Sequence, residues 1–174
     1  MNAPLIPAPL SARAFAPFGD VIETTADTAA ADMNSARFQR YDALATVDHD
    51  KSANTIISIA QCRSATTLPY KIDLMERHPL SSQAFIPLSE FQFVVVVAPK
   101  GESVDFNSIC AFISNGKQGI NYHRGIWHMP LVAFEKGQQF LVVDADEVRP
   151  NCDEQALVQP IWLNGPATTS LGGQ

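Results

Sequence analysis

The sequence predicts an all-β domain, a barrel or a sandwich, from three observations. Short runs rich in β-branched and aromatic residues recur along the 174 residues, and no helical periodicity separates them. Twelve prolines and nine glycines interrupt the chain, which favours short strands and turns over long helices. With 46% hydrophobic and 17% charged residues, the composition is that of a globular protein with its own core. We therefore expect one domain over residues 1–163 and a flexible tail over residues 164–174.

The N-terminal third of the chain predicts a short helical turn and weaker strands. Ser11 is a favourable N-cap for a helical turn over residues 11–15, which Pro17 and Gly19 end. The segments that follow are expected to be a strand at 21–23, a surface loop or short helix at 26–35, and a strand at 37–47.

The strand signal is stronger from residue 55 onward. Residues 91–98 contain four consecutive valines, so we expect a strand that is buried on both faces. Apolar and polar residues alternate in 68–78, which predicts a strand with one face toward the core. The other strands expected from β-branched and aromatic content are 55–62, 109–114, 119–123, 131–134 and 140–144.

Charge and cysteine content exclude several classes of protein. The net charge is −6 and the basic residues are scattered singly, so neither a nucleic acid nor an anionic membrane is an expected partner. No apolar run approaches the ~20 residues of a membrane span, and the first residues do not resemble a signal peptide. The three cysteines are widely spaced and odd in number, which argues against a disulfide framework and predicts a cytoplasmic protein.

Two short runs, residues 75–88 and 121–131, hold three of the four histidines and most other groups that could do chemistry. In the first run, the pleat places Glu76 and His78 on the apolar face of their strand, while Arg77 points the other way. A carboxylate and an imidazole buried side by side are costly unless they are paired, bound to a metal or catalytic. If the strand twists or bulges at its end, both side chains lie instead at a wet rim.

In the second run, Asn121 and His123 share one face of a strand, and Tyr122 and Arg124 share the other. Side chains of these kinds can surround one small polar molecule, with imidazoles for proton transfer and a guanidinium for a carboxylate. Two simpler interpretations stay open. His128 can be a hydrogen-bonded core histidine, and His123 can be a surface residue.

Glu76, His78 and His128 could also bind a divalent metal, although no His-x-His pair supports this. Cys152 lies among turn residues, and no sequence feature indicates a lowered thiol pKa. We therefore do not expect Cys152 to act as a nucleophile.

In these runs the sequence resembles the ureidoglycolate lyase family. Residues 76–88 are similar to the family's first signature, and residues 119–131, centred on Trp127-His128, are similar to the second. The segment 140–144 with Asn151-Cys152 is similar to a third. The resemblance extends from about Phe15 to Leu163 in order and spacing.

The resemblance implies a cupin-like double-stranded β-helix barrel that forms homodimers. It implies cleavage of ureidoglycolate to glyoxylate and urea, a step of allantoin and purine degradation, and it suggests a divalent metal, often nickel. In one departure, many members carry a second histidine after the one corresponding to His128, where this chain has Met129.

On this basis we expect His78 and His128 to take the substrate's hydroxyl proton or to bind the metal. Glu76 would orient an imidazole or complete the metal's ligands. The side chains expected to bind the carboxylate or the urea group of the substrate are Arg77, Gln83, Asn121, Tyr122, His123 and Arg124. Two other functions remain open: an ammonia-releasing ureidoglycolate hydrolase, and a non-catalytic barrel that senses a small acid.

Overall fold

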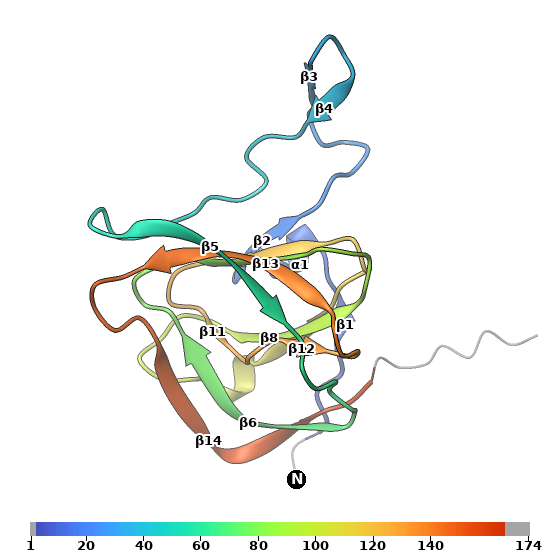
Figure 1. Cartoon of the computed structure of the whole chain (residues 1–174). Coiled ribbons are helices and arrows are strands. Elements are labelled where there is room, and N and C mark those ends of the chain that lie inside the picture. The colour runs from blue at the N-terminus through green and yellow to red at the C-terminus, as the bar shows by residue number, and fades with distance from the viewer. Residues whose placement is uncertain (1–2, 166–174) are drawn as a thin grey trace, which may run out of the picture.

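Residues 3–165, which the computed structural model describes, form two large β-sheets that face each other and a separate two-stranded sheet (Figure 1). The strands of the larger sheet are β1 (Ala8–Pro9), β6 (Tyr70–Arg77), β8 (Phe93–Ala98), β9 (Cys110–Ile113), β11 (Trp127–His128), β12 (Val132–Ala133) and β14 (Asp153–Leu163). Those of the smaller sheet are β2 (Gly19–Ile22), β5 (Asn54–Gln61), β7 (Gln83–Pro87), β10 (Gly119–Tyr122) and β13 (Gln139–Asp146). The predicted all-β class is confirmed, and the arrangement is consistent with a cupin-like barrel.

The strand order of each sheet differs from the chain order. The larger sheet runs β1-β9-β8-β11-β6-β14, with β12 also paired to β8, and the smaller sheet runs β2-β10-β7-β13-β5. Strands β6 and β13 point toward the same end of the barrel, on the left in Figure 1. The ends of strands from both sheets therefore meet there, and this end carries the candidate site.

Apolar side chains fill the space between the two sheets, which we call the inner core, and also cover the opposite face of the larger sheet, which we call the outer cluster. All six residues of β8 are buried. They alternate between the two groups, with Phe93, Val95 and Val97 in the inner core and Val94, Val96 and Ala98 in the outer cluster. The expectation of a strand buried on both faces is confirmed.

The N-terminal helical turn is also confirmed. Helix α1 (Ala12–Phe15) begins after Ser11, whose hydroxyl accepts a hydrogen bond of 3.3 Å from the N–H of Ala14. Phe15 is fully buried in the inner core, so this short helix closes one part of the barrel. A short 3-10 turn, η1 (Phe106–Ser108), is the other helical element of the described residues.

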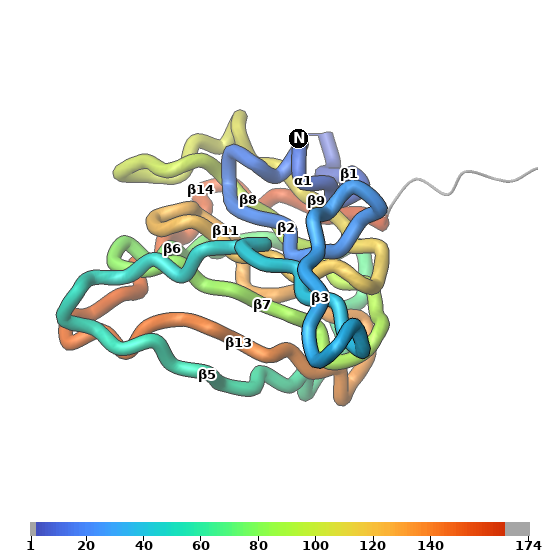
Figure 2. The backbone as a smooth tube through the Cα atoms, turned by 90° about the horizontal axis from the view of Figure 1, so that it is seen from above, coloured from blue at the N-terminus to red at the C-terminus, as the bar shows by residue number. Residues whose placement is uncertain are grey.

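The expectations for residues 26–47 were wrong in part. Within the segment taken as a loop or short helix lies β3 (Ala31–Met33), and of the strand expected at 37–47 only β4 (Phe38–Arg40) exists. The two strands pair as a hairpin whose turn has three residues with positive φ. All six strand residues are exposed, and the hairpin projects from the barrel as an arm (Figures 1 and 2). Because neither face of the arm is buried, its strands need no alternation of apolar and polar residues, the pattern by which a strand is predicted from sequence.

Two strands after residue 80, β7 and β14, were not predicted as strands. Pro160 interrupts β14, and a proline cannot donate a hydrogen bond to a ladder. The sheet tolerates it because the register between β14 and β6 shifts between Ala156 and Ile161.

The unbroken alternation expected for 68–78 was also wrong. Ile72 and Met75 are three positions apart, yet both are buried in the outer cluster, and Tyr70 is 40% exposed. The register shift in β14 lies opposite this part of β6 and changes the facing of its residues.

The boundaries expected for the domain and tail stay predictions. Asn164 donates its N–H to the carbonyl of Leu5 at 2.9 Å, while residues 1–2 and 166–174 lie outside the described residues. Over the described range 3–165, no helix is long and apolar enough to cross a membrane.

Candidate functional site

Strands β6 and β11 bring Glu76 and His128 together at one end of the barrel. The two residues are partners in the antiparallel pair of these strands. His128 also lies opposite Val97 of β8, whose side chain is in the inner core, so the imidazole points between the sheets. Glu76 Oε1 is 3.5 Å from His128 Nε2, and the ring of His78 is centred 5.2 Å from that of His128. One carboxylate and two imidazoles, from segments about 50 residues apart, therefore share one site.

This cluster is largely removed from solvent. The side chain of His128 is 3% exposed and that of Glu76 is 22% exposed. The pKa of the Glu76 carboxyl is lowered chiefly by the neighbouring His128 imidazole, with a further contribution from His78, and burial opposes this without reversing it. Glu76 is therefore ionised at neutral pH.

Backbone carbonyl groups orient both imidazoles. His78 Nδ1 lies 2.6 Å from the carbonyl oxygen of Asn151, and His128 Nδ1 lies 3.0 Å from that of Ile126. A carbonyl oxygen only accepts, so each Nδ1 carries the proton and each Nε2 is left to act as a base or ligand. Gly125 adopts a φ of +76° and donates its N–H to the carbonyl of His78 at 2.8 Å, which ties the two runs together.

Tyr122 of β10 joins this cluster to the smaller sheet. Its ring stacks on the His128 imidazole with 4.3 Å between centroids and 15° between planes. Its hydroxyl is buried and has no hydrogen-bond partner among residues 3–165, and the same is true of His128 Nε2. Burial raises the pKa of Tyr122, and the Glu76 charge raises it further. The phenol therefore stays protonated and is a potential donor at the centre of the site.

A second polar wall follows Tyr122 along the smaller sheet. Tyr122 lies opposite Gln83 of β7, and Gln83 Nε2 donates to Asp144 Oδ2 of β13 at 3.3 Å. Asp144 was not a sequence candidate. Two and four positions earlier along the same pleat, Val142 and Phe140 lie in the inner core, so Asp144 continues the inner wall.

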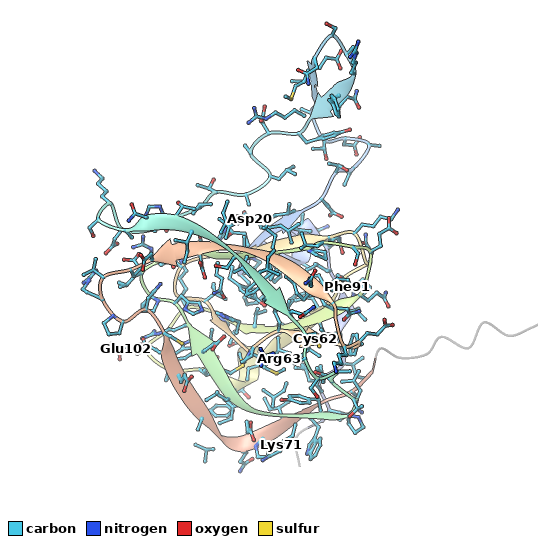
Figure 3. The ribbon with its side chains drawn as sticks, in the orientation of Figure 1. Asp20, Cys62, Arg63, Lys71, Phe91 and Glu102 are labelled. Atoms are coloured by element: carbon cyan, nitrogen blue, oxygen red, sulfur yellow. The ribbon has the colours of Figure 1, made fainter. Side chains whose placement is uncertain are left out.

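The structure places two predicted site residues outside the barrel. Asn121 and His123 share a face, as expected, but it is the face opposite Tyr122. Asn121 Nδ2 donates to Asp20 Oδ2 and to the Thr46 carbonyl at 2.9 and 3.1 Å. His123 Nε2 is 3.2 Å from Asp20 Oδ1, and Figure 3 labels Asp20 near the base of the arm. These contacts hold the arm's base against the barrel and do not reach the cluster.

The two arginines expected to hold a substrate carboxylate are engaged elsewhere. Arg77 forms an ion pair of 2.8 Å with Asp153, and its guanidinium lies over the ring of Trp127 in the outer cluster. Arg124 bonds the carboxylates of Asp48 and Asp50 at 3.0 and 2.9 Å. Each guanidinium is thus already neutralised by an acidic partner, which argues against a direct role in substrate binding.

Cys152 lies beside the cluster, with its sulfur 3.9 Å from Glu76 Oε2. Burial raises the pKa of the Cys152 thiol, and the charges of Glu76 and two further acidic residues raise it more. The thiol is therefore a poor nucleophile at neutral pH, as the sequence led us to expect.

Comparisons with known proteins assign the chain to a family. Residues 2–164 match the family model described as ureidoglycolate lyase. The chain belongs to the ureidoglycolate lyase family. It is 48% identical to the ureidoglycolate lyase of Pseudomonas fluorescens strain SBW25 over 147 residues, 84% of this chain and 87% of that protein. It is 49% identical to that of Pseudomonas aeruginosa strain LESB58, over 84% and 86%, and 47% identical to that of Stutzerimonas stutzeri strain A1501, over 84% and 85%.

Met129, the residue that follows His128, faces away from the cluster. Met129 is 6% exposed and packs in the outer cluster with Trp127, whose indole N–H donates to the carbonyl of Gly101 at 3.1 Å. Methionine at this position therefore fills an apolar space, and a histidine here would not point toward Glu76 and His128.

A separate pocket lies at the opposite end of β5. Its lining includes Cys62, Arg63 and Phe140, and Figure 3 labels the first two at that end of the strand. Phe140 pairs with Ala60 near the end of β5, whereas Asp144 pairs with Ile56 near its start. This pocket is therefore distinct from the end of the barrel that holds Glu76, His78 and His128.

The residues of the cluster fit a divalent metal. Glu76, His78 and His128 each offer one potential ligand atom, and these atoms lie within 4.8 Å of one another. With both Nδ1 atoms bonded to carbonyls, the atoms left to converge are a carboxylate oxygen and two imidazole Nε2 atoms, which is a donor set suited to zinc, nickel or iron. The backbone carbonyls act as the outer partners that orient metal-binding histidines in many proteins.

Proposed function

We propose that this protein cleaves ureidoglycolate to glyoxylate and urea. Membership of the family and near-50% identity to proteins named ureidoglycolate lyase support this activity. The observation that carries it in the structure is the convergence of Glu76, His78 and His128 inside the barrel. Ionisable groups gathered at a buried site of this kind are typical of proton-transfer chemistry.

The reaction needs only two proton transfers. The reacting carbon of ureidoglycolate carries a hydroxyl, a carboxylate and a urea nitrogen. Loss of the hydroxyl proton forms the C=O bond of glyoxylate as the C–N bond breaks, and the departing nitrogen takes a proton to give urea. No water is consumed and no covalent intermediate with the protein is required. Each positioned acid or base contributes on the order of 10²–10⁴ in rate.

The side chains of the cluster divide these tasks. The Nε2 atom of His78 or His128 accepts the hydroxyl proton, and the imidazolium that forms returns a proton to the departing urea nitrogen. Glu76 stabilises the imidazolium that forms, because its charge lies 3.5 Å from His128 Nε2. Tyr122, protonated and stacked on the same ring, is positioned to donate a hydrogen bond to a substrate oxygen.

We propose, as the alternative to the imidazoles acting as bases, that the same three residues hold a divalent metal, because their donor set fits one; both Nε2 lone pairs are then ligands and take no proton from the substrate. A bound metal would polarise the hydroxyl or carboxylate oxygen of the substrate as a Lewis acid. Metal content measured by mass spectrometry, together with calorimetric titration of nickel into chelator-treated protein, tests this without relying on turnover. One metal per chain in the wild type, and none in Glu76→Gln or His78→Ala, is the expected result.

The decisive test of the activity measures urea, glyoxylate and ammonia separately from racemic ureidoglycolate. Equal amounts of urea and glyoxylate without ammonia are expected. Ammonia as the main product would instead indicate a hydrolase. Saturable glyoxylate binding with no turnover would indicate a sensor of small acids.

A homodimer is the assembly that the surface supports best. Ile57 and Ile59 of β5 are 70% and 54% exposed on the outer face of the smaller sheet. Ile59 lies in register with Leu141 of β13, and Leu141 with Ile86 of β7, so aliphatic side chains form a row across three strands. Contiguous apolar surface of this kind is characteristic of interfaces.

The arm favours a second copy of this chain as the partner. It projects above the face that carries Ile57, as the position of β3 and β4 above β5 in Figure 1 shows. Phe38 and Met33 of the arm are 62% and 39% exposed, and an isolated two-stranded hairpin is marginally stable at best. In a two-fold dimer, the arm of each copy would cover the sheet face of the other.

Light scattering after size-exclusion chromatography tests this assembly. The double variant Ile57→Asp with Ile59→Asp should be a monomer. Val158→Asp is the matched control, because Val158 is 89% exposed on β14, away from this face. A wild-type monomer, or an unchanged dimer in the double variant, would contradict the proposal. The cytoplasmic location expected from the sequence stays a prediction.

A further inference from the structure

One inward-facing row of the smaller sheet is polar where the rows below it are apolar. Register places Tyr122 opposite Gln83, and Asp144 follows Val143, which lies opposite Ala84. The next inward row contains Val142, Phe85 and Ile120, all in the inner core. The polar row therefore lies at the end of the inner wall that meets His128, on which Tyr122 stacks.

Asp144 has hydrogen-bonding capacity that the protein leaves unused. Its Oδ2 accepts from Gln83 Nε2 at 3.3 Å, whereas its Oδ1 is buried and has no partner in the described part of the chain. Buried carboxylate oxygens are costly when they lack a donor, and such atoms in native proteins usually have a functional explanation. The group that completes this site must therefore supply N–H or O–H donors.

We propose that Asp144, positioned by Gln83, binds the terminal amide end of the substrate. This inference rests on the proposed function and names the part of the site that recognises urea. The ureido end of ureidoglycolate offers three N–H donors, and the other end carries a carboxylate that Asp144 would repel. The substrate is thus oriented with its nitrogen end at Asp144 and its carbinol carbon at the Glu76–His128 pair.

Asp144 is a specificity residue in this arrangement and takes no proton from the reacting carbon. Tyr122 separates it from His128 along the wall, since Tyr122 lies opposite Gln83 and stacks on His128. Loss of Asp144 should therefore weaken binding of the urea portion selectively. Loss of a residue with a purely structural role would weaken the binding of urea and of glyoxylate equally.

The test compares product inhibition in wild type and Asp144→Asn, which keeps the shape of the side chain and replaces one acceptor oxygen by a donor. We expect KM for ureidoglycolate and the inhibition constant of urea to rise by ~10- to 100-fold, the range for losing a hydrogen bond to a charged group. The inhibition constant of glyoxylate should change by less than about twofold, and kcat should change less than KM. Asp146→Asn, on an exposed residue of the same strand, is the matched control and should leave all four constants unchanged.

A second variant and a binding assay keep the proposal falsifiable. Gln83→Leu removes the donor that positions Asp144. This variant should also weaken the binding of urea more than the binding of glyoxylate. The proposal would be overturned if the inhibition constants of urea and glyoxylate rose equally, or if the inhibition constant of urea did not change. Calorimetric titration with urea alone separates the urea-binding role of Asp144 from the proposed cleavage of ureidoglycolate. If wild-type protein binds urea and Asp144→Asn does not, the subsite stands even where ureidoglycolate is not turned over.

Discussion

Replacing Glu76 by glutamine tests the proposed proton transfer most directly, because the variant keeps the size of the side chain and removes its charge. When His128 accepts a proton, the ion pair with Glu76 forms across 3.5 Å. At an effective dielectric constant of ~20, two unit charges at this distance attract by about 5 kcal/mol. Glutamine retains a hydrogen-bonding oxygen and solvent reaches part of the carboxylate, so about 3–4 kcal/mol of this should be lost. Each ~1.4 kcal/mol is tenfold in rate, and we expect kcat to fall by ~10²–10³.

The assay is urea release under saturating substrate, with thermal unfolding to show that the variant is folded. Glu90→Gln is the matched control, because Glu90 pairs with Lys117 at 3.2 Å on the surface and its side chain is 73% exposed. It should keep the wild-type kcat. Our reasoning about the ion pair is refuted if folded Glu76→Gln retains kcat within tenfold of wild type.

The remaining predictions concern the same end of the barrel. His78→Ala and His128→Ala should each lower kcat by at least ~10² in the same assay, and near-normal turnover by both would remove them from the proton transfer. The folded-state pKa of Glu76 is lowered, so ionised Glu76 adds stability above its ordinary pKa that is lost as pH falls through the lowered value. Denaturant unfolding should therefore show Glu76→Gln less stable than wild type at neutral pH, with the difference closing in acid. Cys152→Ser should keep kcat within about threefold, since the thiol pKa is raised; a loss beyond tenfold would make the thiol a participant. Arg124→Met should lower the free energy of unfolding by ~1–3 kcal/mol through loss of its two ion pairs, with kcat within tenfold of wild type. A large rise in KM for that variant would restore Arg124 as a substrate anchor.

The sequence predicted those parts of the fold in which burial dictates residue type. The all-valine centre of β8 is buried on both faces, as its apolar run predicted. The meeting of Glu76 with His128 followed from pleat alternation and clustering, and it holds because β11 pairs with the end of β6. Even so, the alternation in the middle of β6 is broken by a register shift in β14, a neighbour about 80 residues away that no local pattern reveals.

The missed features depend on partners distant in sequence. Arg124 looked free for a substrate carboxylate, but Asp48 and Asp50 reach it from the segment that follows the arm. Asn121 has the residue type expected of a urea-binding group, yet the pleat turns it outward. Asp144 ends an apolar run and reads as the boundary of a strand. Only the pairing of β13 with β7 shows that it continues the inner wall.

Tyr122 explains why two walls from different sheets can act on one small molecule. Its ring stacks on His128, its backbone lies opposite Gln83, and its hydroxyl is buried without a protein partner among residues 3–165. A phenol kept neutral by burial can donate a proton to a hydrogen bond but does not compete with an imidazole as a base. A substrate oxygen is therefore the partner best suited to this hydroxyl, at the corner between the acid–base pair and the amide-binding wall. Each wall is held by the strand pairing of its own sheet, and the stack of Tyr122 on His128 joins the two walls, so a small molecule that bridges them is oriented by the barrel itself.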